Sequence, residues 1–172
     1  MFLYNAPSNT HHRFDPATVR SAACFPNIVG LKDSGCDMIY FHCVRESLRD
    51  RPDFTLLVGP EELMAEAVLL GGHGGMCAGS NIWPRLYVDL YNAAAACDLD
   101  AVRRLQSTVM RLSTTVYRVD ARESSLLRGM KCAVAELGIC DDGMMPPFEP
   151  FDDAERARIR EYLGELGWIH TP

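Results

Sequence analysis

Apolar and polar residues alternate along the first half of the chain in a pattern that predicts short strands, each followed by a helix. Strands are expected over residues 2–5, 27–33, 53–59 and 74–79, where apolar runs stop at Asn, Asp or Gly. Helices are expected over residues 15–25, 37–50, 61–71 and 82–97. This alternation is typical of a parallel sheet, in which right-handed crossovers bring the carboxyl ends of all strands to one edge.

The pattern changes after residue 97, where strand-like segments stop. Amphipathic helices are expected over residues 98–119, 123–138 and 152–168, with a proline-rich loop at 141–151. We therefore expect two parts, residues 1–97 with four βα units and residues 98–172 as a C-terminal helical extension.

Composition narrows the function classes. The net charge of -6 and the scattered basic residues argue against nucleic-acid binding, and no apolar run approaches the ~20 residues of a membrane span. The seven cysteines are odd in number and form no C-x-x-C pair, which favours free thiols in a reducing cytoplasm over a disulfide scaffold. The N-terminus lacks the charged leader and long apolar core of a signal peptide, so none is expected.

Lys32 ends the apolar run NIVGLK, and this placement has two interpretations. A lysine at a strand end is most simply a solvated terminus. It can also be an amine sheltered in a pocket because it does chemistry. Strand alternation puts Ile28, Gly30 and Lys32 on one face, and Gly30 is expected to leave room beneath the lysine.

Several motifs occur in an order that resembles a known family. They are LYNAP (3–7), NIVGLKDS (27–34), LLVGPEE (56–62) and LGGHGGMCAGSN (70–81), with KCAVAELGI and PPFEPF in the tail. Together they resemble the dihydrodipicolinate synthase/N-acetylneuraminate lyase family of class I, Schiff-base aldolases. The resemblance spans nearly the whole chain and implies an α/β fold, a TIM (β/α)8-type barrel. Only strands 5–8 of the barrel are here, followed by a C-terminal three-helix extension.

The resemblance implies a Schiff base between Lys32 and the ketone of pyruvate or a related α-keto acid. Such an amine must be neutral to attack, and burial disfavours the ammonium form. Neighbouring strands lie ~4.8 Å apart, so Tyr4 at the end of the preceding strand is within reach, and by resemblance it shuttles protons. The covalent lysine imine serves as the electron sink, so no metal and no organic cofactor are expected.

Substrate-binding roles fall by resemblance on Met76, Gly59 and Glu61. Glu61 and Glu62 are otherwise explained as charges at a helix N-terminus. The segment GGHGG at 71–75 resembles a phosphate loop but lacks the Lys-Ser/Thr ending, so its glycines are interpreted as positions where a ligand approaches the backbone.

Some residues depart from the family pattern. Asn9 stands where dihydrodipicolinate synthases carry an arginine, which argues against lysine biosynthesis and for another keto-acid aldolase or an uncharacterised branch of the family. Met145 stands where an arginine is common. The turn after the lysine reads Ser-Gly-Cys at 34–36. His11 and His12 suggest a metal, but no third ligand has suitable spacing, so a polar loop is expected.

The first four βα units of the family's barrel, including its Gly-Thr-Thr-Gly-Glu carboxylate grip, lie outside this sequence, and a complete barrel needs ~250 residues. We therefore expect a truncated chain, or a half barrel that forms a homo-oligomer or pairs with a complementary half. Two hypotheses remain: an aldolase completed from outside the chain, and a catalytically inactive half barrel. A barrel that binds phosphate at its glycine-rich fourth strand is a third interpretation.

Overall fold

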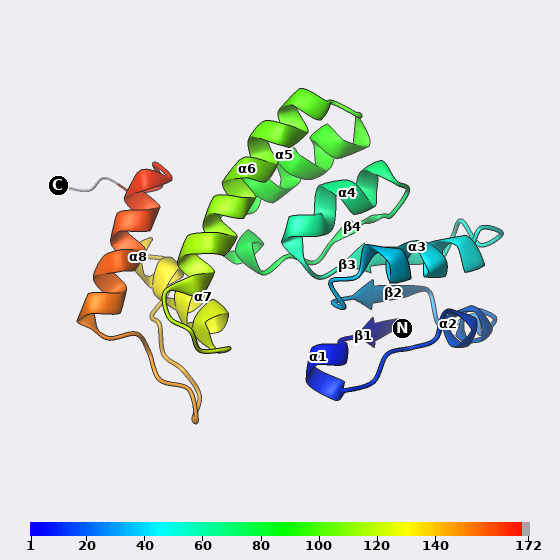
Figure 1. The fold of residues 1–172 in the computed structure, drawn as a ribbon, viewed down its shortest axis with the longest axis horizontal. Coiled ribbons are helices and arrows are strands. Elements are labelled where there is room, and N and C mark those ends of the chain that lie inside the picture. Colours follow the sequence, from blue (N-terminus) through cyan, green and yellow to red (C-terminus); the bar gives the residue numbers. More distant parts are fainter. Residues whose placement is uncertain (170–172) are drawn as a thin grey trace. The chain divides into compact units, whose positions relative to one another are not determined.

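The computed structural model describes residues 1–169, and its described part contains a parallel sheet of four strands (Figure 1). The strands are β1 (Phe2–Asn5), β2 (Gly30–Asp33), β3 (Thr55–Val58) and β4 (Gly74–Gly75). They are hydrogen-bonded in chain order, and every neighbouring pair is parallel. The carboxyl ends of the strands therefore meet at one edge, as the sequence predicts.

The two faces of this sheet differ in exposure because side chains alternate along each strand. The covered face consists of buried residues: Asn5, Leu31, Asp33, Leu56 and Val58. The open face consists of exposed or half-buried residues: Phe2, Tyr4, Lys32, Leu57 and Met76. Lys32 and Leu31 thus lie on opposite faces, as predicted. The room expected beneath the lysine at Gly30 is taken, because the ring of Phe2 lies against that glycine.

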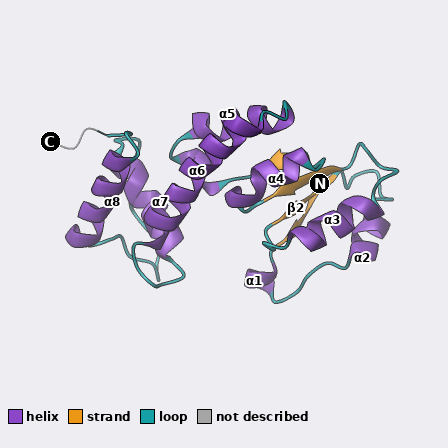
Figure 2. Cartoon of the chain, turned by 45° about the horizontal axis from the view of Figure 1, so that its top comes forward, coloured by secondary structure: helices purple, strands orange, loops and turns teal. Residues whose placement is uncertain are grey.

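Helices α2 (Pro16–Ala22), α3 (Met38–Ser47) and α4 (Met64–Leu69) follow the first three strands (Figure 2). Their buried residues include Val19, Phe41, Val44, Met64 and Ala67. Consecutive right-handed crossovers place such helices on one side of a sheet, which accounts for the covered face.

Side chains at the helix starts explain where α2 and α3 begin. The Asp15 carboxylate accepts a hydrogen bond from the Ala17 N–H at 2.8 Å, and that of Asp37 accepts one from the Tyr40 N–H at 3.0 Å. Each carboxylate satisfies a backbone donor that the helix itself leaves unpaired. Glu61 and Glu62 instead lie in a 3-10 turn, η1 (Glu61–Leu63), that precedes α4.

Two local elements differ from the expectation. A short helix α1 (Pro7–Thr10) lies in a segment where no apolar period marks it. The fourth strand is shorter than residues 74–79, because pairing with β3 ends when the Met76 N–H donates to the Val58 carbonyl oxygen at 2.8 Å. The chain then enters the 3-10 turn η2 (Ala78–Asn81).

The C-terminal half is helical, as predicted. Its elements are α5 (Pro84–Ala95), α6 (Leu99–Thr115), the 3-10 turn η3 (Val116–Arg118), α7 (Ser125–Glu136) and α8 (Asp153–Glu165). A capping box of Asp152 and Glu155 begins α8. In α7, the buried guanidinium of Arg128 bonds Asp120 at 2.5 Å and Glu155 at 3.1 Å. It also donates to the carbonyl oxygens of Glu149 and Pro150, which ties the proline-rich loop to the last helix.

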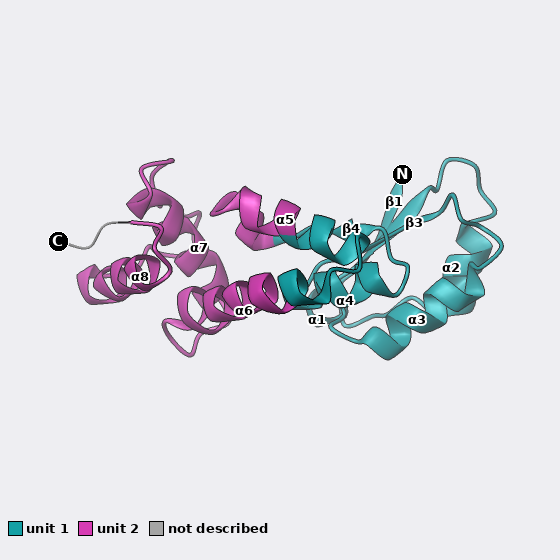
Figure 3. Ribbon diagram, turned by 90° about the horizontal axis from the view of Figure 1, so that it is seen from above, with its two compact units in different colours: residues 1–77, 90–102 teal, residues 78–89, 103–172 magenta. Residues whose placement is uncertain are grey.

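The chain divides into two compact units (Figure 3). One consists of Met1–Cys77 and Leu90–Val102, and the other of residues 78–89 and 103–172. The sheet lies entirely in the first unit. The boundary expected after residue 97 stays a prediction. Among residues 1–169, no helix combines the length and apolar character needed to cross a lipid bilayer.

Candidate active site

Lys32 and Tyr4 lie side by side at the carboxyl edge of the sheet. In the β1–β2 ladder Tyr4 pairs directly with Lys32, and both side chains lie on the open face. The Nζ atom of Lys32 is 4.8 Å from the centre of the Tyr4 ring. Lys32 is half-buried, and the Tyr4 side chain is 57% exposed. The structure therefore brings together the two residues that the sequence proposes as catalytic.

Ser34 adds a hydroxyl to this pair. Its Oγ donates a hydrogen bond to the Tyr4 hydroxyl oxygen at 3.4 Å. The Ser34 N–H donates to the Asn5 carbonyl oxygen at 2.8 Å, which extends the β1–β2 pairing by one step. A strand alternation that places Lys32 on the open face also places Ser34 there, so the sequence contained the signal for this residue.

Gly59 lies directly against the lysine and the serine. A Cβ atom at Gly59 would be 2.1 Å from the Ser34 Oγ and 3.2 Å from the Lys32 Cε. Only a glycine leaves the space that these two side chains occupy. The position named for substrate binding therefore has a clear steric role beside Lys32.

A buried polar pair supports the ends of β1 and β2 from the covered face. The Asn5 Nδ2 donates to the Asp33 Oδ1 at 2.7 Å, and the same oxygen accepts from the Gly35 N–H at 3.0 Å. The Asn5 Oδ1 accepts from the Phe14 N–H at 3.2 Å. Burial raises the pKa of the Asp33 carboxyl above its usual range, because desolvation penalises the charged form. No local sequence pattern marks this pair, because its members are 28 residues apart.

Met76 and Glu61 occupy different surroundings. Met76 is 56% exposed on the open face, one residue beyond β4. Glu61 is buried, with only 3% of its surface exposed. The buried Cys77 thiol has its pKa raised to about 12, first by desolvation and then by the charges of Glu61 and Glu62, while Lys32 lowers it. Glu61 thus lies beneath the site rather than on its surface.

The turn after the lysine has an unusual backbone. Cys36 has a φ of 55°, which few non-glycine residues adopt. Its thiol is exposed, and desolvation is the first cause that raises its pKa. A thiol with a raised pKa is a weak nucleophile at neutral pH, in agreement with the absence of Cys36 from the residues proposed as catalytic.

A cavity adjoins Tyr4 on the side of α1. It has a volume of about 190 Å³, and Tyr4, Thr10, His12 and Arg13 are among the residues that line it. Arg13 pairs with Asp37 at 2.8 Å. Asn9 is exposed in α1. Within residues 1–169, no group of three or more His, Cys, Asp or Glu side chains is placed to hold a metal ion.

Comparison with known proteins gives one consistent result. The model of the dihydrodipicolinate synthetase family matches residues 1–166. The 4-hydroxy-tetrahydrodipicolinate synthase of Alcanivorax borkumensis is 30% identical over 169 residues, covering 98% of this chain and 55% of the relative.

Solved structures with a similar fold belong to the same family. The dihydrodipicolinate synthase of Bacteroides thetaiotaomicron is 49% identical, with a TM-score of 0.93 over 95% of this chain and 55% of that chain. YagE, a prophage protein of the dihydrodipicolinic acid synthase family from E. coli K12 solved with pyruvate, is 26% identical. Its TM-score is 0.87, over 98% of this chain and 56% of that chain.

These matches confirm the predicted fold, since four parallel βα units and the helices after them superpose on about half of a family barrel. The chain spans about half the length of the relatives that it matches. It belongs to the dihydrodipicolinate synthetase family.

Proposed function

We propose that this chain carries the Schiff-base lysine of an aldolase or lyase that acts on pyruvate or a related α-keto acid. The observation that carries the proposal is the direct pairing of Tyr4 with Lys32 at the carboxyl edge of a parallel sheet, the edge where such folds hold their chemistry. Membership of the family and the pyruvate in the YagE structure support the same substrate class.

In this proposal the neutral Lys32 amine attacks the ketone carbon of the keto acid. The carbonyl oxygen leaves as water once it has been protonated, and a C=N bond replaces the C=O bond. When the carbon–carbon bond one position beyond the carbon next to the C=N group breaks, its electron pair forms the C=C bond of an enamine and the C=N pair moves to nitrogen. The same electrons return when that bond forms. The reaction then needs no metal or organic cofactor, because lysine and substrate build the electron sink together.

Tyr4 is proposed to carry the protons of these steps. Its hydroxyl must reach both the nitrogen and the leaving oxygen, and its ring lies 4.8 Å from the Lys32 Nζ. The Ser34 hydroxyl at 3.4 Å can hold the phenol in place and donate to it when the phenol has lost its proton.

The remaining site residues have smaller proposed roles. Gly59 leaves room for the lysine, and the backbone around Met76 offers polar groups to the keto acid. Buried beneath the site, Glu61 acts through its charge rather than by touching substrate. The exposed Asn9, in place of an arginine, favours a keto-acid lyase other than dihydrodipicolinate synthase itself.

We further propose that the open face is covered in the working protein by a second copy of this chain or by a complementary half barrel. Phe2, Tyr4 and Met76 are exposed there, and parallel sheets are ordinarily covered on both faces. The alternative function is a half barrel that associates without catalysis. The seven free cysteines suit the reducing cytoplasm, where we expect the protein to work.

Borohydride trapping tests the proposal. The sequence contains only two lysines, Lys32 and Lys131, so a reduced pyruvate adduct can be assigned by peptide mass. The full chain is incubated with pyruvate and borohydride, beside the variants Lys32→Arg and Lys131→Arg. We expect the adduct on Lys32 in the wild type and in Lys131→Arg, and its loss in Lys32→Arg.

A wild-type chain that gains no adduct, or gains it equally on both lysines, contradicts the enzymatic proposal. The inactive half barrel would then be the better account. Circular dichroism of each variant checks that the fold is retained, and Lys131→Arg is the matched control because it removes the other lysine from a helix outside the sheet.

A further inference from the structure

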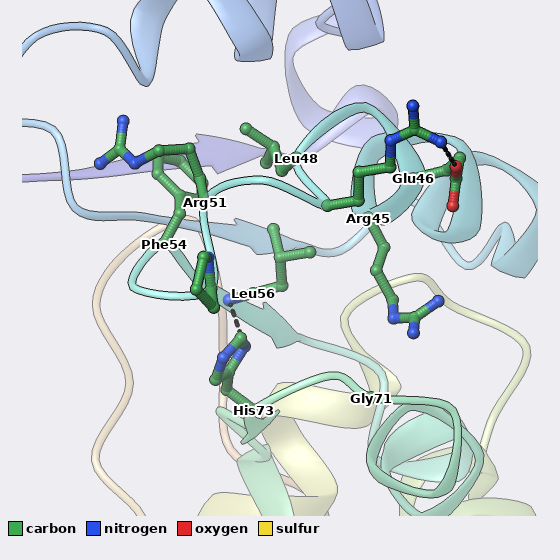
Figure 4. A pocket seen from close by; sticks show the side chains of 10 residues that line it. Arg45, Glu46, Leu48, Arg51, Phe54, Leu56, Gly71 and His73 are labelled. Carbon is green, nitrogen blue, oxygen red and sulfur yellow. Dashed lines mark hydrogen bonds and ion pairs between the residues drawn. The ribbon is translucent and has the colours of Figure 1, made fainter.

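A cavity of about 250 Å³ lies at the amino edge of the sheet, opposite the edge that carries Lys32 (Figure 4). Its wall comes from the end of α3, the segment just before β3, and the glycine-rich segment just before β4. Phe54 immediately precedes β3 and His73 immediately precedes β4, which fixes the edge. All of these residues belong to the first unit, and neither Lys32 nor Tyr4 lines the cavity.

Arg45 brings an uncompensated positive charge to this cavity. Two neighbouring arginines already have carboxylate partners, since Arg49 pairs with Glu46 at 3.3 Å and Arg51 pairs with Asp53 at 2.8 Å. Within the part of the chain that the structure describes, the Arg45 side chain forms no hydrogen bond and no ion pair. Its guanidinium therefore keeps its donors available for a ligand.

Gly71 holds the guanidinium in place. A Cβ atom there would lie 2.8 Å from the Arg45 Nε and 3.0 Å from its Nη2, so the guanidinium lies directly on the glycine backbone. Gly71 also has a φ of 92°, a conformation that other residues rarely adopt. The start of the GGHGG segment thus contacts the arginine side chain. The backbone N–H groups of Gly71 and Gly72 donate to carbonyl oxygens of α4, so they are not available to a ligand.

His73 supplies a second donor. The Leu56 N–H donates to the His73 Nδ1 at 3.0 Å, as the dashed line in Figure 4 shows, and the His73 N–H donates to the Leu56 carbonyl oxygen at 2.9 Å. Because a backbone N–H can only donate, Nδ1 is an acceptor and the ring proton is on Nε2. The ring is therefore fixed in position with one N–H still to offer.

The inner wall of the cavity is apolar. Leu48, Phe54 and Leu56 line it and are each buried. An arginine fork next to an apolar wall matches a ligand with an oxyanion at one end and a small apolar body, and the His73 N–H is a separate donor on the lining. A cavity of this volume has no room for a nucleotide.

We propose that this cavity binds a small organic carboxylate, with its oxyanion on the Arg45 guanidinium and its apolar body on the Leu48–Phe54–Leu56 wall. The guanidinium offers two parallel N–H donors to a carboxylate, a geometry that a neutral amide cannot use as well. The site does not depend on the imine chemistry, because it lies at the other edge of the sheet.

Calorimetric titration of the full 172-residue chain tests the proposal with three probes: benzoate, benzamide and inorganic phosphate. Benzoate is expected to bind at one site. Benzamide, which has the same shape without the charge, is expected to bind at least tenfold more weakly, and phosphate, which lacks the apolar body, is also expected to bind more weakly than benzoate. No benzoate binding, or equal affinities for benzoate and benzamide, overturns the proposal; tighter binding of phosphate overturns the assigned ligand class.

Two variants locate the site. Arg45→Gln is expected to weaken benzoate at least tenfold, and because Arg45 is exposed the fold does not depend on it. Arg85→Gln is the matched control, since Arg85 is an exposed arginine that lies outside the cavity and interacts with Asp89 at 3.9 Å. Undiminished binding in Arg45→Gln, or equal losses in both variants, places the ligand elsewhere and overturns the assignment.

Discussion

The covered and open faces of the four-stranded sheet are built from the same short strands, yet they meet different surroundings. On the covered face, Leu56 is 3% exposed beneath helices of the same chain. On the open face, Phe2 and Tyr4 are 44% and 57% exposed. Parallel sheets are ordinarily buried on both faces, so this chain satisfies half of the packing that its sheet requires.

Neighbouring residues of β1 and β2 divide their roles between these faces. Tyr4 and Lys32 point to the open face, where a substrate can reach them, while the next residues, Asn5 and Asp33, bond each other on the covered face. The pair proposed as catalytic therefore lies next to a buried polar pair one residue further along. Because side chains alternate between the two faces, residues with a proposed catalytic role and residues that stabilise the strand ends follow one another along each strand.

Replacing two neighbouring leucines of β3 tests how much each face of the sheet contributes to stability, and its expected effect is the largest. Leu56→Ala should lower the free energy of unfolding by about 2–5 kcal/mol, because it opens a cavity on the covered face. Leu57→Ala removes the same atoms from the half-buried open face and should cost no more than about 1 kcal/mol. Urea unfolding followed by circular dichroism measures both.

The two variants control each other, since they lie in one strand and change the same residue type. Similar losses of stability in both would mean that the open face is covered in solution. Association of the chain at the protein concentration used is the first cause to examine in that case.

Charges placed on the open face test whether it is an associating surface, with a smaller expected effect. The double variant Phe2→Glu and Met76→Glu should weaken self-association at least tenfold, because two carboxylates would be desolvated at the contact. The comparable change on α3, Ile39→Glu, should have no effect, since Ile39 is already 79% exposed away from the open face. Sedimentation velocity over a range of concentrations measures the difference.

A wild-type chain that sediments as a monomer would contradict covering of the open face by a second copy. It would leave a complementary half barrel as the partner to look for, and co-expression with such a half would then be the informative measurement.

The pH dependence of stability tests the covered face with the smallest expected effect. Burial raises the folded-state pKa of Asp33, so the folded protein favours its neutral form. The stabilising contribution of Asp33 is fully present below its unfolded pKa of about 3.9 and is lost as the pH rises through the folded value. Asp33→Asn, which stays neutral, should therefore become more stable relative to the wild type as the pH rises.

Urea unfolding of both proteins between about pH 3 and pH 7 checks this direction. The opposite trend, with the wild type gaining on Asp33→Asn as the pH rises, would show that the hydrogen bonds from Asn5 and Gly35 outweigh the desolvation of the carboxylate.

Most of the fold could be predicted because its signals are local. The strand–helix alternation follows from the apolar period, and the structure confirms it. Helix α1 could not be predicted, since Pro7–Thr10 has no apolar residue to mark a face. The early end of β4 could not be predicted from the hydrophobic pattern either, because it depends on pairing with β3 and not on the residues of β4 themselves.

The candidate site was predictable where side-chain alternation and motif spacing agree, as for Lys32 and Tyr4. The Phe2 ring over Gly30 was not predictable, because it depends on the register between β1 and β2. The Asn5–Asp33 hydrogen bond was not predictable for the same reason, since its partners are 28 residues apart in the sequence. The contact between Gly71 and the Arg45 side chain was also not predictable. The two residues belong to different elements, and no local pattern in the sequence links them.

The direct pairing of Tyr4 with Lys32 has a consequence for how this protein can change. Their separation is set by the hydrogen-bonded ladder and not by the connection between the strands, so insertions in the exposed segment before α2, residues 11–13, should leave the two proposed catalytic groups aligned. A single residue inserted at Leu3 would instead rotate Tyr4 away and offer the lysine a different neighbour. The segment before α2 is thus free to change in length, while the four-residue strand β1 is not.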